Sequence, residues 1–437
     1  MAHVCLMIAR LGGGGAERVV LRLARGLCER GHRVDLALFG YENAYPDELD
    51  ERVSIFVFAR RPGRFEKMRR RAANLLRLRK KAYPAVELPA RAEWRARRLP
   101  PGRLLLFLVR LAKDRCCRRA FRRVRRGDFR RARRAGSYIE ERKPDIVFTN
   151  LPRSELAGFF ASSMIRDCPP VVPVLHNIAD RSEADLLRPA YLAAAHIVAV
   201  SEGVRQDHIA AYGLSPANIT TICNPAATPA IARLAEEAPG HSWFGDGGPP
   251  VVLGVGRLEP QKDFATLVDA FQRVLVERPC RLLILGEGPL RGELEERVRA
   301  LGLEDCTSLP GWAENPYAHM ARAALFVLSS RFEGFGNVLV EALACGCPAV
   351  STDCPAGPAE ILEDPALLAT VGDPEALARV MLDALARPAD RTALRAQAAR
   401  FSMERAVAGY EGVAELVLRR GRAVTPPAPQ PDRWRRI

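Results

Sequence analysis

Short apolar runs alternate with amphipathic stretches along most of the chain. Residues 3–9 form an apolar run of strand length, residues 16–30 carry apolar side chains at helical spacing, and residues 34–39 form a second strand-length run. A strand, a helix and a strand in this order predict a βαβ unit, which is typical of parallel sheets. The same alternation predicts further strands at residues 145–149, 171–175, 197–200, 251–255, 281–285, 324–328 and 349–351, and helices at 264–276 and 290–301.

The alternation is interrupted at residues 224–250, a stretch rich in alanine, proline and glycine that predicts a connection between two domains. We therefore expect an α/β protein in which two Rossmann-like domains, residues 1–223 and 251–391, face each other across a cleft. A long helical pattern at residues 392–420 is expected to pack back toward the first domain, and residues 421–437 are expected to form a tail.

Positive charge is concentrated in one segment of the chain. The 437 residues carry 66 Lys and Arg against 51 Asp and Glu, a formal net charge of +15. Residues 60–134 hold 29 basic and five acidic residues, so this segment carries +24 and the rest of the chain −9. Its helical pattern is broken by prolines, which indicates a basic helical insertion within the first domain.

Two interpretations of this insertion stay open. Residues 104–109 are all apolar and lie between Arg103 and Arg110, which fits an interfacial patch on an anionic membrane. A solvated, Arg-rich insertion without a partner fits the same charge. Nucleic acid is disfavoured as a partner because few aromatic residues accompany the basic ones. The apolar run is far shorter than the roughly 20 residues that a membrane-spanning helix needs.

The polar motifs exclude several kinds of site. Eleven cysteines are scattered without a C-x-x-C pair, which disfavours a disulfide framework and a zinc site and favours a reducing compartment. The apolar amino terminus lacks a basic leader and a cleavage site, so it is interpreted as a strand and not as a signal peptide. No D-x-D pair is present to hold a metal on a nucleotide diphosphate, and P-loop and G-x-S-x-G motifs are also missing.

Candidate anion-binding groups follow several predicted strands. Residues 12–15 are four glycines between a strand and a helix, where backbone N–H groups can approach an anion, although such glycines also serve tight turns alone. Arg257 and Lys262 follow the first strand of the second domain, at the sheet edge where open α/β sheets bind ligands, and can clamp a diphosphate. His176 follows the strand at 171–175, where a single histidine is often structural.

Two carboxylates lie eight residues apart around a Gly-Phe-Gly loop. We expect Glu333 to lie in the loop and a helix to begin near Asn337, which places Glu341 about one turn inside that helix. The amides of Asn337 and Val338 would then point at a bound anion.

These motifs resemble those of the family 4 retaining glycosyltransferases, which have the two-domain GT-B fold. The resemblance covers nearly the whole chain outside the basic insertion and the tail, and residues 351–362 resemble enzymes that build bacterial lipid-linked oligosaccharides, capsules and exopolysaccharides. The matching segments are Gly-Gly-Ala-Glu-Arg-Val at 14–19, Arg-Gly-His at 30–32, Val-Ser-Glu-Gly-Val at 200–204, Asn-Pro at 224–225, Gly-Arg-Leu at 256–258, Gln-Lys-Asp at 261–263, Leu-Gly-Glu-Gly-Pro at 285–289, and the pair Glu333 and Glu341.

The resemblance implies a role for each candidate residue. Glu333 and His176 would be the catalytic residues that face the donor sugar, and Glu341 would hydrogen-bond the nucleotide ribose. Pro310, Gly311 and Trp312 would line the base pocket. The donor diphosphate would be held by Arg257, Lys262, Gly14, Gly15, Asn337 and Val338.

We therefore expect a retaining glycosyltransferase that moves a hexose or N-acetylhexosamine from a nucleotide sugar, with a UDP-sugar as the favoured donor, to a lipid-linked saccharide. No metal or other cofactor and no nucleic acid partner is expected. The expected location is cytoplasmic, peripheral on the inner face of the cytoplasmic membrane, with an anionic membrane surface as a further partner. A GT-B-type nucleotide-sugar epimerase and a non-catalytic membrane-binding scaffold are the alternatives, and the combination of Arg257, Lys262, Glu333 and Glu341 favours the enzyme over the scaffold.

Overall fold

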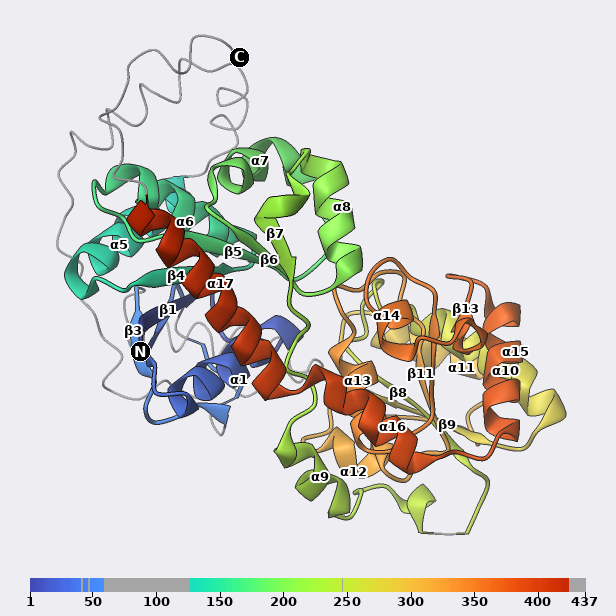
Figure 1. Ribbon diagram of the computed structural model, residues 1–437. Helices are drawn as coiled ribbons and strands as arrows, with labels where there is room; N and C mark the ends of the chain where they lie inside the picture. Colours follow the sequence, from blue (N-terminus) through green and yellow to red (C-terminus); the bar gives the residue numbers. More distant parts are fainter. Residues whose placement is uncertain (41, 46–47, 59–125, 246, 424–437) are drawn as a thin grey trace, which may run out of the picture.

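The first half of the protein is built on a parallel sheet. The computed structural model describes residues 1–40, 42–45, 48–58, 126–245 and 247–423 (Figure 1). Within these residues the sheet has seven strands in the order β3-β2-β1-β4-β5-β6-β7, all parallel. The strands are β1 His3–Ile8, β2 Arg33–Leu38, β3 Ser54–Val57, β4 Ile146–Asn150, β5 Val171–Leu175, β6 Ile197–Ala199 and β7 Ile219–Thr221, and the helices are α1 Gly15–Glu29, α5 Arg126–Arg142, α6 Pro152–Met164, α7 Ala184–Ala193 and α8 Glu202–Tyr212.

The second half repeats this plan with a sheet of its own. Its six described strands have the order β10-β9-β8-β11-β12-β13 and are again parallel. The strands are β8 Val251–Val255, β9 Arg281–Leu285, β10 Thr307–Gly311, β11 Leu325–Leu328, β12 Ala349–Thr352 and β13 Leu368–Ala369, and the helices are α10 Phe264–Glu277, α11 Arg291–Ala300, α12 Pro316–Met320, α13 Asn337–Ala344, α14 Pro358–Leu362 and α15 Pro374–Ala386. Two parallel sheets with flanking helices confirm the predicted fold class.

In both sheets the first strand lies inside the sheet, and later strands are added first on one side of it and then on the other. In the first sheet β1 lies between β2 and β4, and in the second β8 lies between β9 and β11. At such a switch point the loops after neighbouring strands turn to opposite faces and leave a crevice at the carboxyl ends. The loops after β1, β4, β5, β8 and β11 are therefore the segments in which to look for a site.

The chain passes between the two domains twice, and both passages differ from the sequence expectation. Residues 224–250 were expected to be loose, but Pro229 begins a helix, α9 Pro229–Glu236. The single helix expected at residues 392–420 is two helices, α16 Arg391–Ala398 and α17 Met403–Ala423, because Ser402 between them is extended. The two passages are joined by a bridge between Ala227 and Ser402.

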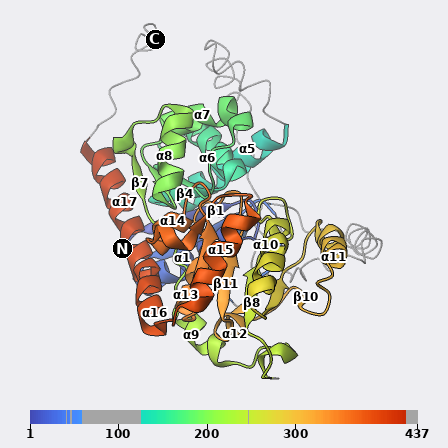
Figure 2. The same cartoon turned by 90° about the vertical axis from the view of Figure 1, so that its right-hand side faces the viewer.

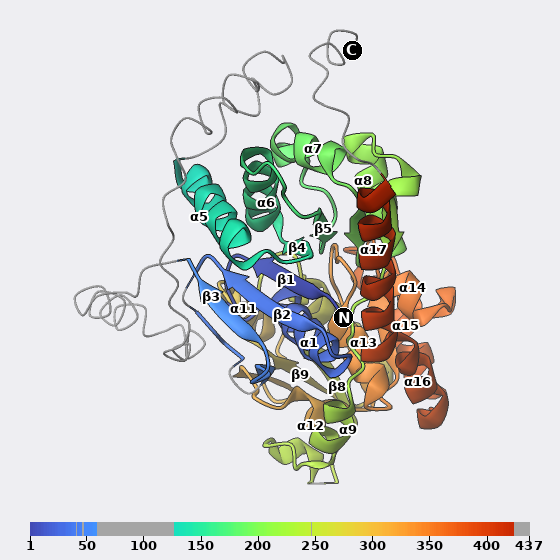
Figure 3. The same ribbon diagram turned by 60° about the vertical axis from the view of Figure 1, so that its left-hand side comes forward.

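The late helix α17 returns to the first domain, as expected, and lies along α1 (Figures 2 and 3). The contact is close, because a methyl group added at Gly26 of α1 would lie 2.6 Å from Val407. Tyr410 packs against Phe148 of β4 at 5.1 Å between ring centroids, and Glu411 pairs with His32 at 2.9 Å. Helix α17 therefore covers one face of the first sheet together with α1.

The opposite face of the first sheet is covered by α5 and α6. Ala135, Tyr138 and Ile139 of α5 are buried in one cluster with Cys5 and Met7 of β1. Residues 126–134 were assigned to the basic insertion, but they belong to this structural helix, because small and apolar side chains recur at helical spacing among the arginines. The greater part of the segment, residues 60–125, lies outside the described residues.

Strands β3, β7, β10 and β13 were not among the expected strands. Each is short or contains few apolar residues, so none gives an apolar run long enough to stand out. Among the described residues, no helix is both long and apolar enough to cross a bilayer.

One buried carboxyl group makes the stability of the first domain depend on pH. Glu155 in the first turn of α6 is 2% exposed and accepts a 2.6 Å hydrogen bond from Tyr191 Oη. Burial raises the pKa of Glu155 to about 8. An unfolded glutamate has a pKa of about 4.3. Between these values the folded protein keeps a proton that the unfolded chain releases, so the free energy of unfolding falls as pH rises through this window.

We predict that Glu155→Gln removes this fall in the free energy of unfolding with rising pH. The difference in melting temperature between the variant and wild type should grow as pH rises from about 4 to about 8, since the amide has no charge to bury. Glu236→Gln, on the exposed side of α9, is the matched control and should follow wild type. A constant difference between Glu155→Gln and wild type over the whole range would contradict the prediction.

Candidate functional site

A cleft of about 670 Å³ lies between the carboxyl ends of the two sheets. It is lined from the first domain by the glycine loop after β1 and the loop after β5, and from the second domain by the loops after β8, β9 and β11. The sequence-predicted residues that line it are Gly14, Gly15, His176, Arg257, Lys262, Trp312, Glu333, Asn337, Val338 and Glu341. Pro310 and Gly311 lie on β10, and of the three expected base-pocket residues Trp312 lines the cleft.

Glu333 lies in the loop after β11, as its position before the glycines predicts. Its Oε1 accepts hydrogen bonds from Lys262 Nζ at 2.5 Å and from Ser330 Oγ at 2.6 Å. Its side chain is 8% exposed and that of Lys262 is 17% exposed. Lys262 was expected to bind phosphate, yet here its ammonium group is paired with Glu333, so this part of the cleft has no net charge.

Arg257 is a more accessible cation than Lys262. Its side chain is 49% exposed and pairs with Glu259 at 3.1 Å, a weak surface contact. Across the cleft Glu17 lies at the start of α1, where its carboxylate is close to the backbone of Gly14. Burial raises the pKa of Glu17, while Arg257 and Arg10 favour its ionised form. The glycine loop therefore already faces a carboxylate of its own helix, which sequence analysis did not single out.

Helix α13 begins at Asn337, as predicted. Gly336 before it has a φ of 97°, a left-handed conformation that favours glycine, and the first two residues of the helix, Asn337 and Val338, line the cleft. The Asn337 side chain accepts a 2.9 Å hydrogen bond from Asn224 Nδ2, so the passage between the domains holds the start of the helix.

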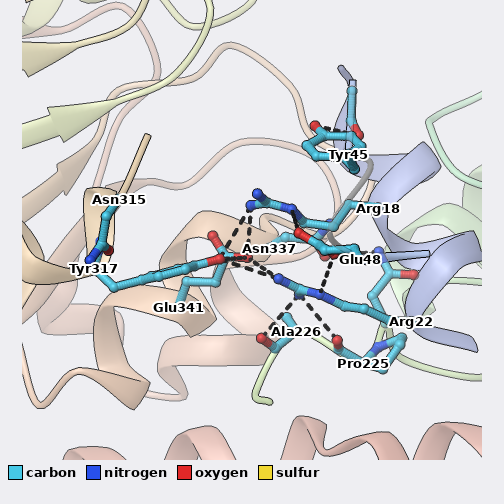
Figure 4. Close-up of polar contacts among 12 residues, drawn as sticks. Arg18, Arg22, Tyr45, Glu48, Pro225, Ala226, Asn315, Tyr317, Asn337 and Glu341 are labelled. Carbon is cyan, nitrogen blue, oxygen red and sulfur yellow. Dashed lines mark hydrogen bonds and ion pairs between the residues drawn. The ribbon is translucent and has the colours of Figure 1, made fainter. Parts of the chain in front are cut away.

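Glu341 is buried one turn inside α13 and contacts the opposite domain (Figure 4). Its Oε1 accepts hydrogen bonds from Arg22 Nη2 at 3.0 Å and from Tyr317 Oη at 3.3 Å. Arg18 Nη1 lies 4.0 Å from the same oxygen. Arg18 and Arg22 were missed, although they are four residues apart on the helix after the glycine loop and therefore share one face.

His176 is an uncharged group at physiological pH. Burial lowers the pKa of His176 to about 4. Its Nε2 lies 2.9 Å from Asn150 Oδ1, and Asn150 Nδ2 donates to the carbonyl of Met7 at 3.4 Å, so we assign the proton to Nε2. Nδ1 is buried without a hydrogen-bond partner in the described structure.

The two domains also touch directly beside the cleft. Ser201 Oγ donates a 2.6 Å hydrogen bond to the Gly334 carbonyl, and Glu360 accepts 2.8 Å hydrogen bonds from the amides of Glu202 and Gly203. A side chain on Gly334 would collide with the His176 carbonyl, 1.8 Å from the added carbon. Segments 200–204 and 351–362, which matched the family motifs, therefore contact each other. Through this contact the carboxylate of Glu360, from the second domain, caps the first turn of helix α8.

The described residues contain no cluster of three or more His, Cys, Asp or Glu arranged to hold a metal ion. The polar groups of the cleft are instead paired cations and carboxylates beside the first turn of α13.

Family models match both halves of the chain. Residues 13–86 and 90–228 match the model described as Glycosyltransferase Family 4, and residues 249–387 match the model described as Glycosyl transferases group 1. The chain belongs to the family 4 glycosyltransferases. This membership confirms the resemblance on which the site roles rest.

Two curated relatives of this family 4 member act in bacterial glycan synthesis. It is 32% identical over 228 residues to the N-acetylgalactosamine-N,N'-diacetylbacillosaminyl-diphospho-undecaprenol 4-alpha-N-acetylgalactosaminyltransferase of Campylobacter jejuni, a match that spans 50% of this chain and 60% of the relative. It is 27% identical over 255 residues to the lipopolysaccharide 1,6-galactosyltransferase of Escherichia coli, spanning 56% of this chain and 67% of the relative.

Solved structures show the same fold. A glycosyltransferase from Rickettsia africae aligns with a TM-score of 0.65 at 16% identity, covering 95% of this chain and 99% of that one. HepE of Anabaena, solved in complex with UDP, aligns with a TM-score of 0.62 at 20% identity, and the alignment again covers 95% of this chain and 99% of that one.

We predict that Glu360→Gln weakens the contact between the domains. A glutamine offers one amide oxygen where the carboxylate offers two, so one amide of α8 loses its partner at a cost of about 1–3 kcal/mol. The melting temperature should fall by several degrees. Glu363→Gln, at the end of the same helix and paired with Arg400, is the matched control. Equal melting temperatures for Glu360→Gln and Glu363→Gln would show that the cap contributes nothing.

Proposed function

We propose that this family 4 member is a retaining glycosyltransferase that moves a hexose or N-acetylhexosamine from a nucleotide sugar, with a UDP-sugar as donor, to a lipid-linked saccharide. The observation that carries the proposal is that Glu333, Lys262 and the first turn of α13 line one cleft opposite His176 and the glycine loop. This arrangement supplies groups for a sugar and for an anionic leaving group at the same place.

The chemistry follows from where charge develops. The bond between the anomeric carbon and the diphosphate breaks while an acceptor hydroxyl attacks the same face of the sugar, and the hydroxyl proton passes to a diphosphate oxygen. Negative charge on the departing diphosphate is stabilised by Arg257 and by the amides of Asn337 and Val338. Positive charge on the sugar is stabilised by the Glu333 carboxylate. None of these groups needs a metal ion to act.

Lys262 has two roles in this scheme. Bound to Glu333, it holds that carboxylate in place in a mostly buried loop. When a donor enters, the three donors of the ammonium group allow it to contact a phosphate oxygen as well. Neutral His176 lines the cleft beside the donor sugar and adds no charge to it.

The acceptor side is proposed from the relatives. The Campylobacter relative is named for a diphospho-undecaprenol-linked substrate, and the Escherichia coli relative for lipopolysaccharide. We infer a lipid-linked saccharide acceptor here, and a position on the inner face of the cytoplasmic membrane, where the basic segment of residues 60–125 would contact anionic lipid.

The first test is a thermal-shift and hydrolysis screen of the purified protein against UDP-, GDP-, ADP- and dTDP-sugars with EDTA present. We expect stabilisation by a UDP-sugar, because a ligand that binds only the folded state raises its stability. A response that needs a divalent cation would contradict the metal-free scheme. Conversion of the sugar nucleotide without acceptor would favour an epimerase, and binding without turnover when acceptor is supplied would favour a scaffold.

We predict that Glu333→Gln lowers turnover about 10²–10³-fold, since the amide cannot stabilise positive charge on the sugar. The melting temperature should fall modestly, because the amide oxygen can still accept from Ser330 and Lys262 but Lys262 loses its counter-charge. Glu277→Gln, on the exposed end of α10, is the matched control. An unchanged rate for Glu333→Gln would remove this residue from the reaction.

We also predict that the protein sediments with vesicles of anionic lipid at low salt and not with zwitterionic vesicles. Attraction is worth about 1 kcal/mol per basic residue near an anionic surface and is screened by salt. Replacement of Leu105 and Phe107 by Ser should weaken the sedimentation if the apolar run enters the interface. Equal recovery with both vesicle types would exclude the membrane interpretation of the basic segment.

A further inference from the structure

Arg22 of α1 is a buried charge that contacts three separate parts of the protein. Its side chain is 7% exposed. Its Nη1 donates to the carbonyls of Pro225 and Ala226, each at 3.2 Å, in the passage between the domains. Its Nη2 donates to Glu341 of the second domain. Arg22 therefore joins the first domain, the passage and the proposed ribose carboxylate.

Arg22 and Glu341 stay paired because each is a buried charge that is neutralised by the other. The Glu341 side chain is 8% exposed, and a buried charge without a partner is strongly unfavourable. Tyr317 Oη accepts a hydrogen bond from Arg22 at 3.3 Å and donates to Glu341, which closes a triangle of contacts visible in Figure 4. Glu48 balances part of the remaining positive charge, lying 2.7 Å from Arg18 Nε.

The protein contacts only one of the two carboxylate oxygens of Glu341 among the described residues. Among the described residues, Arg22, Tyr317 and Arg18 all contact its Oε1, and Oε2 has no polar partner there. Glu341 lines the cleft, so a ligand can reach the carboxylate. One oxygen is fixed by the protein and the other keeps its lone pairs for a hydroxyl donor.

We propose that Arg22 is a positioning residue for ribose recognition. It fixes Glu341 through Oε1 so that Oε2 accepts hydrogen bonds from the ribose hydroxyls of a nucleoside diphosphate. Because Arg22 belongs to the opposite domain and binds the passage, the ribose subsite is complete only in this arrangement of the two domains. The inference rests on the proposed assignment of Glu341 to the ribose and extends it across the cleft.

The test compares calorimetric affinities for UDP and 2′,3′-dideoxy-UDP, which differ only in the ribose hydroxyls. Wild type should bind UDP about 10-fold or more tightly than the dideoxy analogue, because a site built for hydroxyls rejects a ligand that lacks them. Arg22→Met should bring this ratio close to one. Arg25→Met is the matched control, since Arg25 lies on the same helix and pairs with Asp50 of its own domain.

Two further variants separate positioning from a structural role. Tyr317→Phe keeps the ring and removes one hydrogen bond to Oε1, so it should lower the ratio and also serves if Arg22→Met fails to fold. In a Glu341→Gln background, Arg22→Met should not change the ratio further, because Arg22 acts through Glu341.

The outcomes distinguish this inference from the proposed function. A wild-type protein that does not bind UDP, or does not prefer it over the dideoxy analogue, overturns the assignment of Glu341 to ribose and this inference with it. A wild-type preference that persists in both Arg22→Met and Tyr317→Phe overturns the inference alone, even if both ligands bind more weakly to the variants.

Discussion

A parallel sheet sends the carboxyl ends of all its strands to one edge, and the two sheets of this protein meet along those edges. Every group discussed for the site follows from this constraint. The glycine loop, His176, Arg257 and Glu333 each come directly after a strand, so residues more than 300 positions apart in the sequence line one cleft. The approach is close enough that Gly334 has no room for a side chain against the His176 carbonyl.

The charged groups at this cleft are paired with one another. Lys262 is bound to Glu333, Arg22 to Glu341, and the glycine loop faces Glu17. Burial makes such pairing necessary, because each of these charges would otherwise be costly. Under the proposals above, a donor that enters the cleft is bound by groups that keep these partners, so its affinity reflects contacts added to charges that are already paired.

The elements nearest the site were predictable from the sequence because their signals are local. Strand runs ending in polar residues placed His176 and Arg257, and the glycines around residue 335 predicted both the Glu333 loop and the helix that begins at Asn337. The contacts across the cleft were not predictable. Arg22 reads as an ordinary helical arginine, and its partners Glu341 and Tyr317 lie about 300 residues away, where periodicity gives no information. The break at Ser402 was missed for the same reason, since it arises from the path between domains and not from a weak helical pattern.

The first domain is complete only when helix α17, which is made at the end of synthesis, has packed against it. Helix α17 packs on α1 and against Phe148, yet it is synthesised only after all six described strands of the second sheet. Until then the face of the first sheet that Tyr410 covers is open to solvent, and His32 lacks its partner Glu411. During synthesis on the ribosome, the amino-terminal domain therefore keeps an exposed apolar surface until the second domain and α17 have been made. Contacts between residues so far apart in the sequence form late in folding.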